Sequence, residues 1–177
     1  MKLKALLITL LAVLIFVCGC SGSSDGVEVP EGMKPFSNEH VDYTAFIPLS
    51  WTIDMSTGTM SAYVSSSDAS NISITAQALE GSMTLDEYWK SYEEDFKATF
   101  GDMKYEGKAP TTTTLSGLPA NKYEYTADVT NNSYKFMQVV CIKDTSIYVI
   151  TYTSTPEQYD ANLDDVYKVL DNFSFND

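Results

Sequence analysis

The sequence of 177 residues lacks arginine, contains a single histidine and has only three cysteines. Its 11 basic residues are therefore all lysines, and 24 acidic residues outnumber them, so that the formal net charge is −13. Proteins that bind nucleic acids or anionic lipid headgroups use clusters of Arg and Lys against phosphate groups. This composition excludes a nucleic-acid partner and argues against electrostatic attraction to a membrane surface.

The scarcity of histidine and cysteine also limits the chemistry that this chain can perform. His40 lies far along the chain from every candidate serine nucleophile, and the sequence has no paired Cys and His motif for a zinc site. Cys141 lies inside an apolar run, where we expect a buried and unreactive thiol. The acidic runs at 93–95 and 160–165 lack the glycine-containing loop of a calcium site. We therefore predict a protein that is not an enzyme and that has no metal and no cofactor.

The longest apolar run lies close to the N-terminus. Residues 5–17 are apolar except for Thr9, and they follow Lys2 and Lys4. A helix of this length spans about 20 Å at roughly 1.5 Å per residue, which is shorter than the hydrocarbon core of a bilayer, about 30 Å. A positive start followed by a short apolar run is typical of a cleaved secretory signal peptide.

The tetrapeptide Val17–Cys20 that ends this run resembles the lipobox of bacterial lipoproteins. Gly19 is the small residue before the cleavage site, and Val17 is the apolar residue three positions before Cys20. The resemblance implies signal-peptidase cleavage between Gly19 and Cys20, and a lipid on Cys20 that holds the protein at the extracytoplasmic face of the cell membrane. The alternative is an ordinary signal peptide in which the two cysteines are incidental.

These features divide the chain into three segments. Residues 1–19 form the predicted signal peptide. Residues 20–36 form the lipidated N-terminus and a flexible linker, rich in Ser, Gly, Pro and Glu. Residues 37–177 form one extracytoplasmic domain of ordinary size for a single core. Once Cys20 is acylated, Cys141 is the only cysteine left, and no disulfide can form within the domain.

Helical spacing of apolar residues predicts a helix over residues 85–100. The apolar stripe consists of Leu85, Tyr88, Trp89, Tyr92, Phe96 and Phe100. Thr84 and Glu87 have the spacing of a capping box, in which each side chain bonds the other residue's backbone N–H. We expect Gly101 to end the helix, because glycine adopts positive φ without a steric penalty.

A second helix is expected near the C-terminus. Thr155 and Gln158 repeat the capping-box spacing, and Pro156 stands at the first helical position, where its missing N–H has no cost. Its expected apolar stripe consists of Tyr159, Leu163, Val166, Tyr167 and Leu170. Residues 173–175 are expected to form a short closing strand.

Alternating apolar residues predict strands on both sides of the first helix. The expected strands are residues 41–47 (with 51–54 after a bend), 61–65 and 72–79, then 120–129, 134–142 and 147–153, with turns at 117–119 and 131–132. The short connections predict antiparallel pairing. Residues 136–142 and 147–150 are apolar on both faces, so both faces of the sheet must be covered. The sequence therefore predicts an α+β domain, in which helices cover an antiparallel sheet as an α/β/α sandwich.

Several of these motifs resemble those of the PsbP-like superfamily. They are Phe46–Trp51, the helix with Trp89, Gly117–Ala120 before a tyrosine-rich strand, and Phe173–Phe175 after the closing helix. The resemblance covers most of residues 37–177 and implies an α/β/α sandwich. Known members are largely non-enzymatic, and include the PsbP subunit of photosystem II and a nuclear-import factor that binds the GTPase Ran. The resemblance implies a protein-binding or accessory role, and it carries over no site residue.

We therefore predict a membrane-anchored extracytoplasmic lipoprotein that acts as a non-catalytic protein-binding or accessory module at the cell envelope. It would contact the membrane through the lipid on Cys20 and could bind a protein or another cell-surface partner. The alternative is a carrier of a small apolar or cationic ligand, held in a pocket between the sheet and a helix. An enclosed apolar cavity would favour the carrier.

Replacing the predicted acylated cysteine tests the anchor. In Cys20→Ala there is no sulfur to accept the lipid, so we expect the protein to remain unprocessed or to be shed into the medium. Cell fractionation with immunoblotting of the precursor and mature forms measures this. Normal processing together with retention in the membrane would contradict the lipidation.

Overall fold

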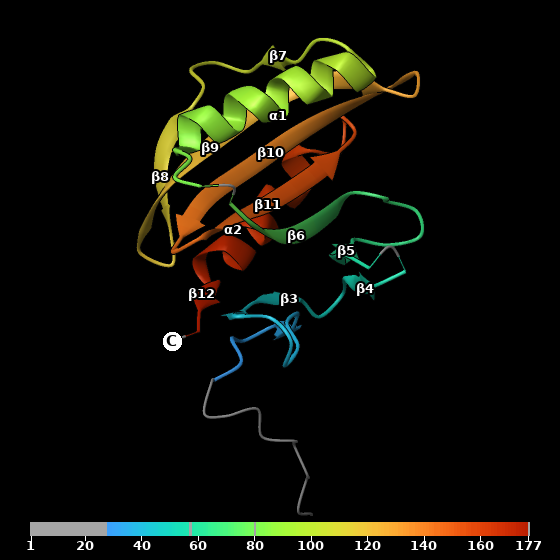
Figure 1. Ribbon diagram of the computed structural model, residues 1–177. Coiled ribbons are helices and arrows are strands. Elements are labelled where there is room, and N and C mark those ends of the chain that lie inside the picture. Colours follow the sequence, from blue (N-terminus) through green and yellow to red (C-terminus); the bar gives the residue numbers. More distant parts are fainter. Residues whose placement is uncertain (1–27, 57, 80, 177) are drawn as a thin grey trace, which may run out of the picture.

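The computed structural model describes residues 28–56, 58–79 and 81–176, which form a β-rich domain with two α-helices (Figure 1). The predicted signal peptide, the cleavage site at Gly19 and the lipidation site at Cys20 lie outside the described residues. No helix among the described residues is long and apolar enough to cross a membrane.

The elements follow one another in this order along the described chain. The strands before the first helix are β1 (Met33–Pro35), β2 (Tyr43–Thr44), β3 (Phe46–Pro48), β4 (Thr52–Asp54), β5 (Met60–Tyr63) and β6 (Asn71–Ala78). Helix α1 (Leu85–Phe100) precedes β7 (Lys104–Tyr105), β8 (Thr111–Leu115), β9 (Leu118–Val129), β10 (Asn132–Lys143) and β11 (Ser146–Ser154). A 3-10 turn, η1 (Asp160–Asn162), then α2 (Leu163–Asp171) and β12 (Ser174–Phe175) complete the domain.

One antiparallel sheet of eight strands organises the described part of the chain. Its order is β4-β5-β6-β11-β10-β9-β7, and β8 also pairs with β9. The long strands β9, β10 and β11 form its centre, where Val139 lies opposite Ile150 on one side and Lys122 on the other. The expected antiparallel meander after α1 is therefore confirmed.

Side chains from both faces of this sheet are buried. On the first face α1 packs against β9 and β10, in a cluster of Trp89, Phe96, Met103, Tyr123, Tyr125, Ala127, Phe136, Val140, Ile147 and Val149. On the second face α2 and the ribbons β1–β3 and β2–β12 cover a cluster that includes Phe36, Ile47, Trp51, Ile72, Met137, Val139, Cys141, Ile150, Val166 and Val169. The two faces alternate along β10 and β11, as their apolar sequences predict.

The domain is thus mostly sheet with two helices, and the expected α/β/α sandwich is met only in part. The α1 layer is a single helix, as expected (Figure 1). The second layer is mixed, because short strands share the cover of the sheet with the nine-residue α2. A helix of nine residues is about 14 Å long at 1.5 Å per residue, too short to cover the second face alone.

Helix α1 begins and ends where the sequence predicts. The Thr84 hydroxyl accepts from the Glu87 N–H at 3.2 Å, and the Glu87 carboxylate accepts from the Thr84 N–H at 2.9 Å. Gly101, at a φ of 101°, donates its N–H to the Lys97 carbonyl at 3.1 Å. Trp89 and Phe96 are the buried residues of the predicted stripe.

The second helix begins later than the sequence predicts. The Thr155 hydroxyl bonds the side chain of Gln158 at 3.4 Å, and the segment that follows forms turns and η1 before α2 begins at Leu163. Asn162 precedes α2 without a side-chain capping bond. Val169 is buried, whereas Tyr167 is 39% exposed and lies beneath the Lys122 ammonium, 5.8 Å from its ring centroid. The predicted stripe was therefore wrong at Tyr167.

The segment before α1 differs most from the expectation. The linker predicted through residue 36 is shorter, because Met33–Pro35 pairs with β3 and both Met33 and Phe36 are buried. The alternating strand expected over residues 41–47 is instead divided into β2 and β3, which pair with β12 and β1 outside the main sheet. Residues 45–48 are all buried, so alternation does not hold there.

Two hairpin turns lie one residue earlier than expected. Ser116 and Gly117, at φ values of 50° and 78°, join β8 to β9, so Leu118 and Pro119 already belong to the strand. Thr130 at 53° and Asn131 at 68° join β9 to β10 in the same way. Positive φ at both central residues gives the twist that a two-residue hairpin requires.

The capping box of α1 can be tested by stability. In Thr84→Ala the Glu87 N–H loses its acceptor, so we expect the free energy of unfolding to fall by about 1 kcal/mol. Thr99→Ala in the last turn removes a hydroxyl bonded to the Asp95 carbonyl and is expected to change stability far less. Urea denaturation followed by circular dichroism measures both variants. Equal curves for wild type and Thr84→Ala would contradict the role of the cap.

Candidate functional site

A hydrogen-bonded network of polar side chains lies between α1 and the sheet. Gln138, which is 3% exposed, accepts from the Tyr125 hydroxyl at 2.9 Å and donates to Tyr92 at 3.2 Å and Thr151 at 3.0 Å. Burial raises the pKa of Tyr125 well above its usual range. Because the hydroxyl stays protonated at neutral pH and every partner is satisfied, this network stabilises the packing of α1 and offers no general base.

Beside α1 the aromatic packing reaches the surface in a small groove of about 210 Å³. The Trp89 ring stacks on Tyr123 with centroids 3.5 Å apart, and its indole N–H donates to the Tyr105 hydroxyl at 2.8 Å. Burial raises the pKa of Tyr105 to about 12. Asp86 and Glu93 line the rim of this groove. The stack is nearly covered, since Trp89 is only 6% exposed, so little aromatic surface is left for a ligand.

A second depression, of about 310 Å³, lies between α1 and β6. Met83, Tyr88, Tyr92 and Asp95 are among its lining residues. It opens to solvent along the side of α1. It therefore does not match the enclosed apolar cavity that a small-ligand carrier between sheet and helix would need.

His40 lies beside a larger cleft of about 470 Å³ on the other side of the domain. The cleft separates the segment of His40 and Asp42 from β5 and β6, and Met55 forms part of its wall. The His40 side chain is 82% exposed, and its nearest charged partner is Glu39 at 3.9 Å. His40 is thus a solvent-exposed imidazole at the edge of the domain, as the sequence analysis expects.

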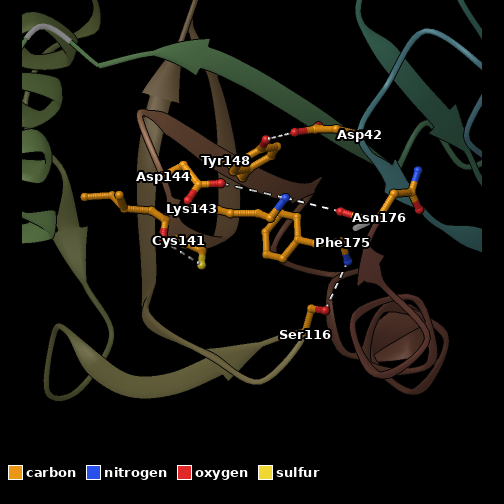
Figure 2. Close-up of polar contacts among 9 residues, drawn as sticks. Asp42, Ser116, Cys141, Lys143, Asp144, Tyr148, Phe175 and Asn176 are labelled. Carbon is orange, nitrogen blue, oxygen red and sulfur yellow. Dashed lines mark hydrogen bonds and ion pairs between the residues drawn. The ribbon is translucent and has the colours of Figure 1, made fainter.

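Asp42 serves a structural role at this edge. Its carboxylate accepts a hydrogen bond from the Tyr148 hydroxyl, whose pKa is raised to about 12, chiefly by burial (Figure 2). Nearby, the Lys143 ammonium donates to the Asn176 carbonyl at 3.2 Å, and the Phe175 N–H donates to the Ser116 hydroxyl at 3.0 Å. These contacts fasten the C-terminal segment to the sheet. Sequence analysis missed the Asp42–Tyr148 pair, because no local pattern links residues so far apart.

Cys141 is fully buried in β10, as the sequence predicts. Burial raises the pKa of its thiol to about 11, so the reactive thiolate is scarce at neutral pH. Among residues 28–56, 58–79 and 81–176, no group of three or more His, Cys, Asp or Glu side chains is placed to hold a metal ion.

The outer surface of the domain has two features that could contact another molecule: acidic side chains on α1 and exposed apolar side chains. Helix α1 exposes carboxylates at Asp86, Glu87, Glu94 and Asp95. Six large apolar side chains of the described residues are also exposed: Val29 (43%), Leu49 (61%), Ile53 (41%), Met55 (46%), Phe100 (45%) and Tyr167 (39%). Phe100 ends α1 and Tyr167 lies in α2, whereas Leu49, Ile53 and Met55 lie within residues 49–55, at the opposite end of the domain from α1 (Figure 1). The sequence analysis placed Phe100 in the apolar stripe of the first helix, which was wrong, because the last turn of α1 extends beyond the sheet cover and leaves Phe100 45% exposed. It did not single out Leu49, Ile53 or Met55 as exposed residues.

The fold is similar to that of several solved structures, among them a cyanobacterial PsbP. CyanoP, the cyanobacterial PsbP of Synechocystis sp. PCC 6803, matches with a TM-score of 0.59 and 16% identity over 89% of this chain and 99% of its own. PA94, a Pseudomonas aeruginosa protein of unknown function, matches with a TM-score of 0.56 and 15% identity over 79% and 94%. A Bacteroides thetaiotaomicron structure matches at 0.58 and 10% identity over 82% of this chain and 49% of its own.

The sequence itself identifies the family. A model of the DcrB family matches residues 46–172, which span both helices and all strands of the main sheet. This chain therefore belongs to the DcrB family. No curated protein matches the sequence. At 10–16% identity the solved structures support the fold alone.

The rate at which Cys141 reacts with a thiol reagent tests whether its thiol is buried and protonated. Cys141 is the only cysteine among the described residues, and we expect it to resist a maleimide under native conditions, because it is buried and protonated. A chain produced from residue 28 onward contains no other thiol. In concentrated urea one maleimide per chain should be added. Mass spectrometry before and after unfolding measures the difference. Rapid labelling of the native protein would show that β10 opens or that the thiol is activated.

Proposed function

We propose that this DcrB-family chain is an envelope lipoprotein, held at the extracytoplasmic face of the membrane by acylated Cys20. We further propose that it acts there as a non-catalytic accessory module that binds a protein partner. The single observation that carries the binding role is the acidic surface of α1, at the end of the domain remote from residue 28 (Figure 1).

The charge of this surface points to a basic partner. Residues 85–100 contain five carboxylates and two lysines, and the Glu93–Lys97 pair at 3.1 Å neutralises one of the carboxylates. Glu94 and Asp95 are both exposed on the helix. Complementary charge steers association and fixes orientation. The exposed Phe100 at the end of α1 would add an apolar contact next to the acidic surface.

The carrier hypothesis receives less support from the same geometry. The depressions on both sides of α1 are open and lined by polar as well as apolar residues. The interior between α1 and the sheet is filled by stacked aromatic rings and the Gln138 network. A carrier would use an enclosed cavity that buries most of its ligand. The surface features therefore favour a partner that contacts the domain from outside.

Charge reversal on α1 tests the proposal. In Glu94→Lys/Asp95→Lys we expect photo-cross-linking of the lipidated protein to its partner, in its own membrane and with a reagent that does not react with carboxylates, to fall about tenfold. An exposed charge contact contributes roughly 0.2–1 kcal/mol and charge reversal adds repulsion, so two reversals can amount to about 1.4 kcal/mol, which corresponds to a factor of ten. Mass spectrometry identifies the cross-linked species, which should be basic and should be lost at high salt.

A matched control separates this effect from a general change in charge. Glu157→Lys/Asp171→Lys makes the same change at two exposed residues near α2, on the second face of the sheet. We expect it to leave the cross-links unchanged, with both variants folded by circular dichroism. Equal loss in both double variants, or no loss in the first, would overturn the proposed role of the α1 surface.

A further inference from the structure

We infer that the turn Pro48–Trp51 is a membrane-contacting surface, which inserts Leu49 into the lipid interface and orients the tethered domain. This inference rests on the Cys20 anchor proposed above and adds a second, weaker contact of the same chain with the bilayer. Three observations carry it: a leucine fixed outward, two further exposed apolar residues on the same short segment of chain, and their place at the tethered end.

The backbone of this turn is held firmly while its leucine points to solvent. The Leu49 N–H donates to the Gly32 carbonyl at 3.0 Å, and the Trp51 N–H donates to the Pro48 carbonyl at 3.1 Å. The Lys34 ammonium donates to the Leu49 carbonyl at 3.0 Å and also to the Trp51 carbonyl. Trp51 is 1% exposed, whereas Leu49 is 61% exposed. The buried neighbours therefore fix Leu49 in an exposed position.

Two further apolar residues are exposed within the next six positions. Ile53 in the edge strand β4 is 41% exposed, and Met55, two residues further, is 46% exposed. Ile53 lies opposite the buried Ala62 of β5, so its side chain stands on the second face of the sheet, which the β1–β3 ribbon helps to cover. Leu49 is thus accompanied by exposed apolar residues on the same short segment of chain, which adds to the apolar character of this end of the domain.

The turn bonds to Gly32, which lies a short distance along the chain from Cys20, and this indicates that the turn contacts the membrane. Eight peptide steps separate Cys20 from Glu28, the first described residue, and they span at most about 28 Å at roughly 3.5 Å each. Gly32 lies four residues beyond Glu28 and bonds directly to Leu49. The end that carries β3 and β4 is therefore the end that the lipid holds near the bilayer, and α1 lies at the far end (Figure 1).

The chemistry of this contact must be apolar. The formal net charge of −13 becomes −15 once Lys2 and Lys4 leave with the signal peptide, and Glu28 and Glu31 are exposed near the turn. Anionic headgroups would repel such a surface. The Lys34 ammonium is occupied by two carbonyl oxygens of the turn. Burial of Leu49 and its neighbours in a neutral lipid interface is the favourable interaction that remains.

A spin label next to the turn tests this inference. The mature lipidated protein with Ser50→Cys carries a nitroxide and is reconstituted in phosphatidylcholine vesicles. We expect the label to collide more with oxygen, which concentrates in lipid, than with a water-soluble nickel chelate. In the Leu49→Asp background this preference should be lost. A label at Glu94→Cys on α1 is the matched control, and it should prefer the nickel chelate in both backgrounds.

The outcomes distinguish this inference from the anchor itself. Mass spectrometry of the same sample establishes whether Cys20 carries its lipid. An acylated protein whose label at residue 50 behaves like the label on α1 would overturn the membrane contact alone. An unacylated Cys20 would overturn the anchor and the contact together. If the label at residue 50 collided with neither oxygen nor the nickel chelate, and cross-linking gave a covalent dimer, the surface would bind a second copy of the chain. That result would overturn the lipid contact.

Discussion

The fold depends on the need to cover both faces of one sheet. Strands β10 and β11 place Phe136, Val140 and Val149 on one face and Val139, Cys141 and Ile150 on the other, and all six are buried. Helix α1 covers the first face, and α2 with two short ribbons covers the second. With both faces of the sheet buried, the outer surfaces of α1 and α2, the sheet edges and the two ends of the domain are available for contact with other molecules.

This constraint explains which parts of the fold could be predicted from the sequence. Helix α1 has local signals at both ends and one apolar stripe, and its bounds agree with the prediction. The apolar run 136–142 correctly predicted that both faces of the sheet are buried. By contrast, β2 and β3 pair with β12 and β1, and nothing local distinguishes such ribbons from sheet strands. The start of α2 was also predicted wrongly. The spacing of Thr155 and Gln158 predicts a helix there, but residues 156–159 form turns and α2 begins at Leu163.

The same reasoning explains why the candidate site emerged only with the structure. Cys141 and His40 could be judged from their sequence neighbours, and one is buried and the other exposed. The exposed Leu49 could not be identified, because its exposure results from a turn fixed by Gly32 and Lys34, which lie just before and within β1, the strand that pairs with β3. The satisfied Gln138 network likewise depends on side chains from α1, β9 and β11 that meet only in the folded chain.

The central claim is that a lipid on Cys20 holds one end of this domain at the membrane and leaves α1 free at the other. The most direct measurement is the intact mass of the protein extracted with detergent from its native membrane. The account predicts a chain that begins at Cys20 and carries the added mass of a diacylglycerol. A mature chain that begins at any other residue, or that carries no acyl group, would contradict it.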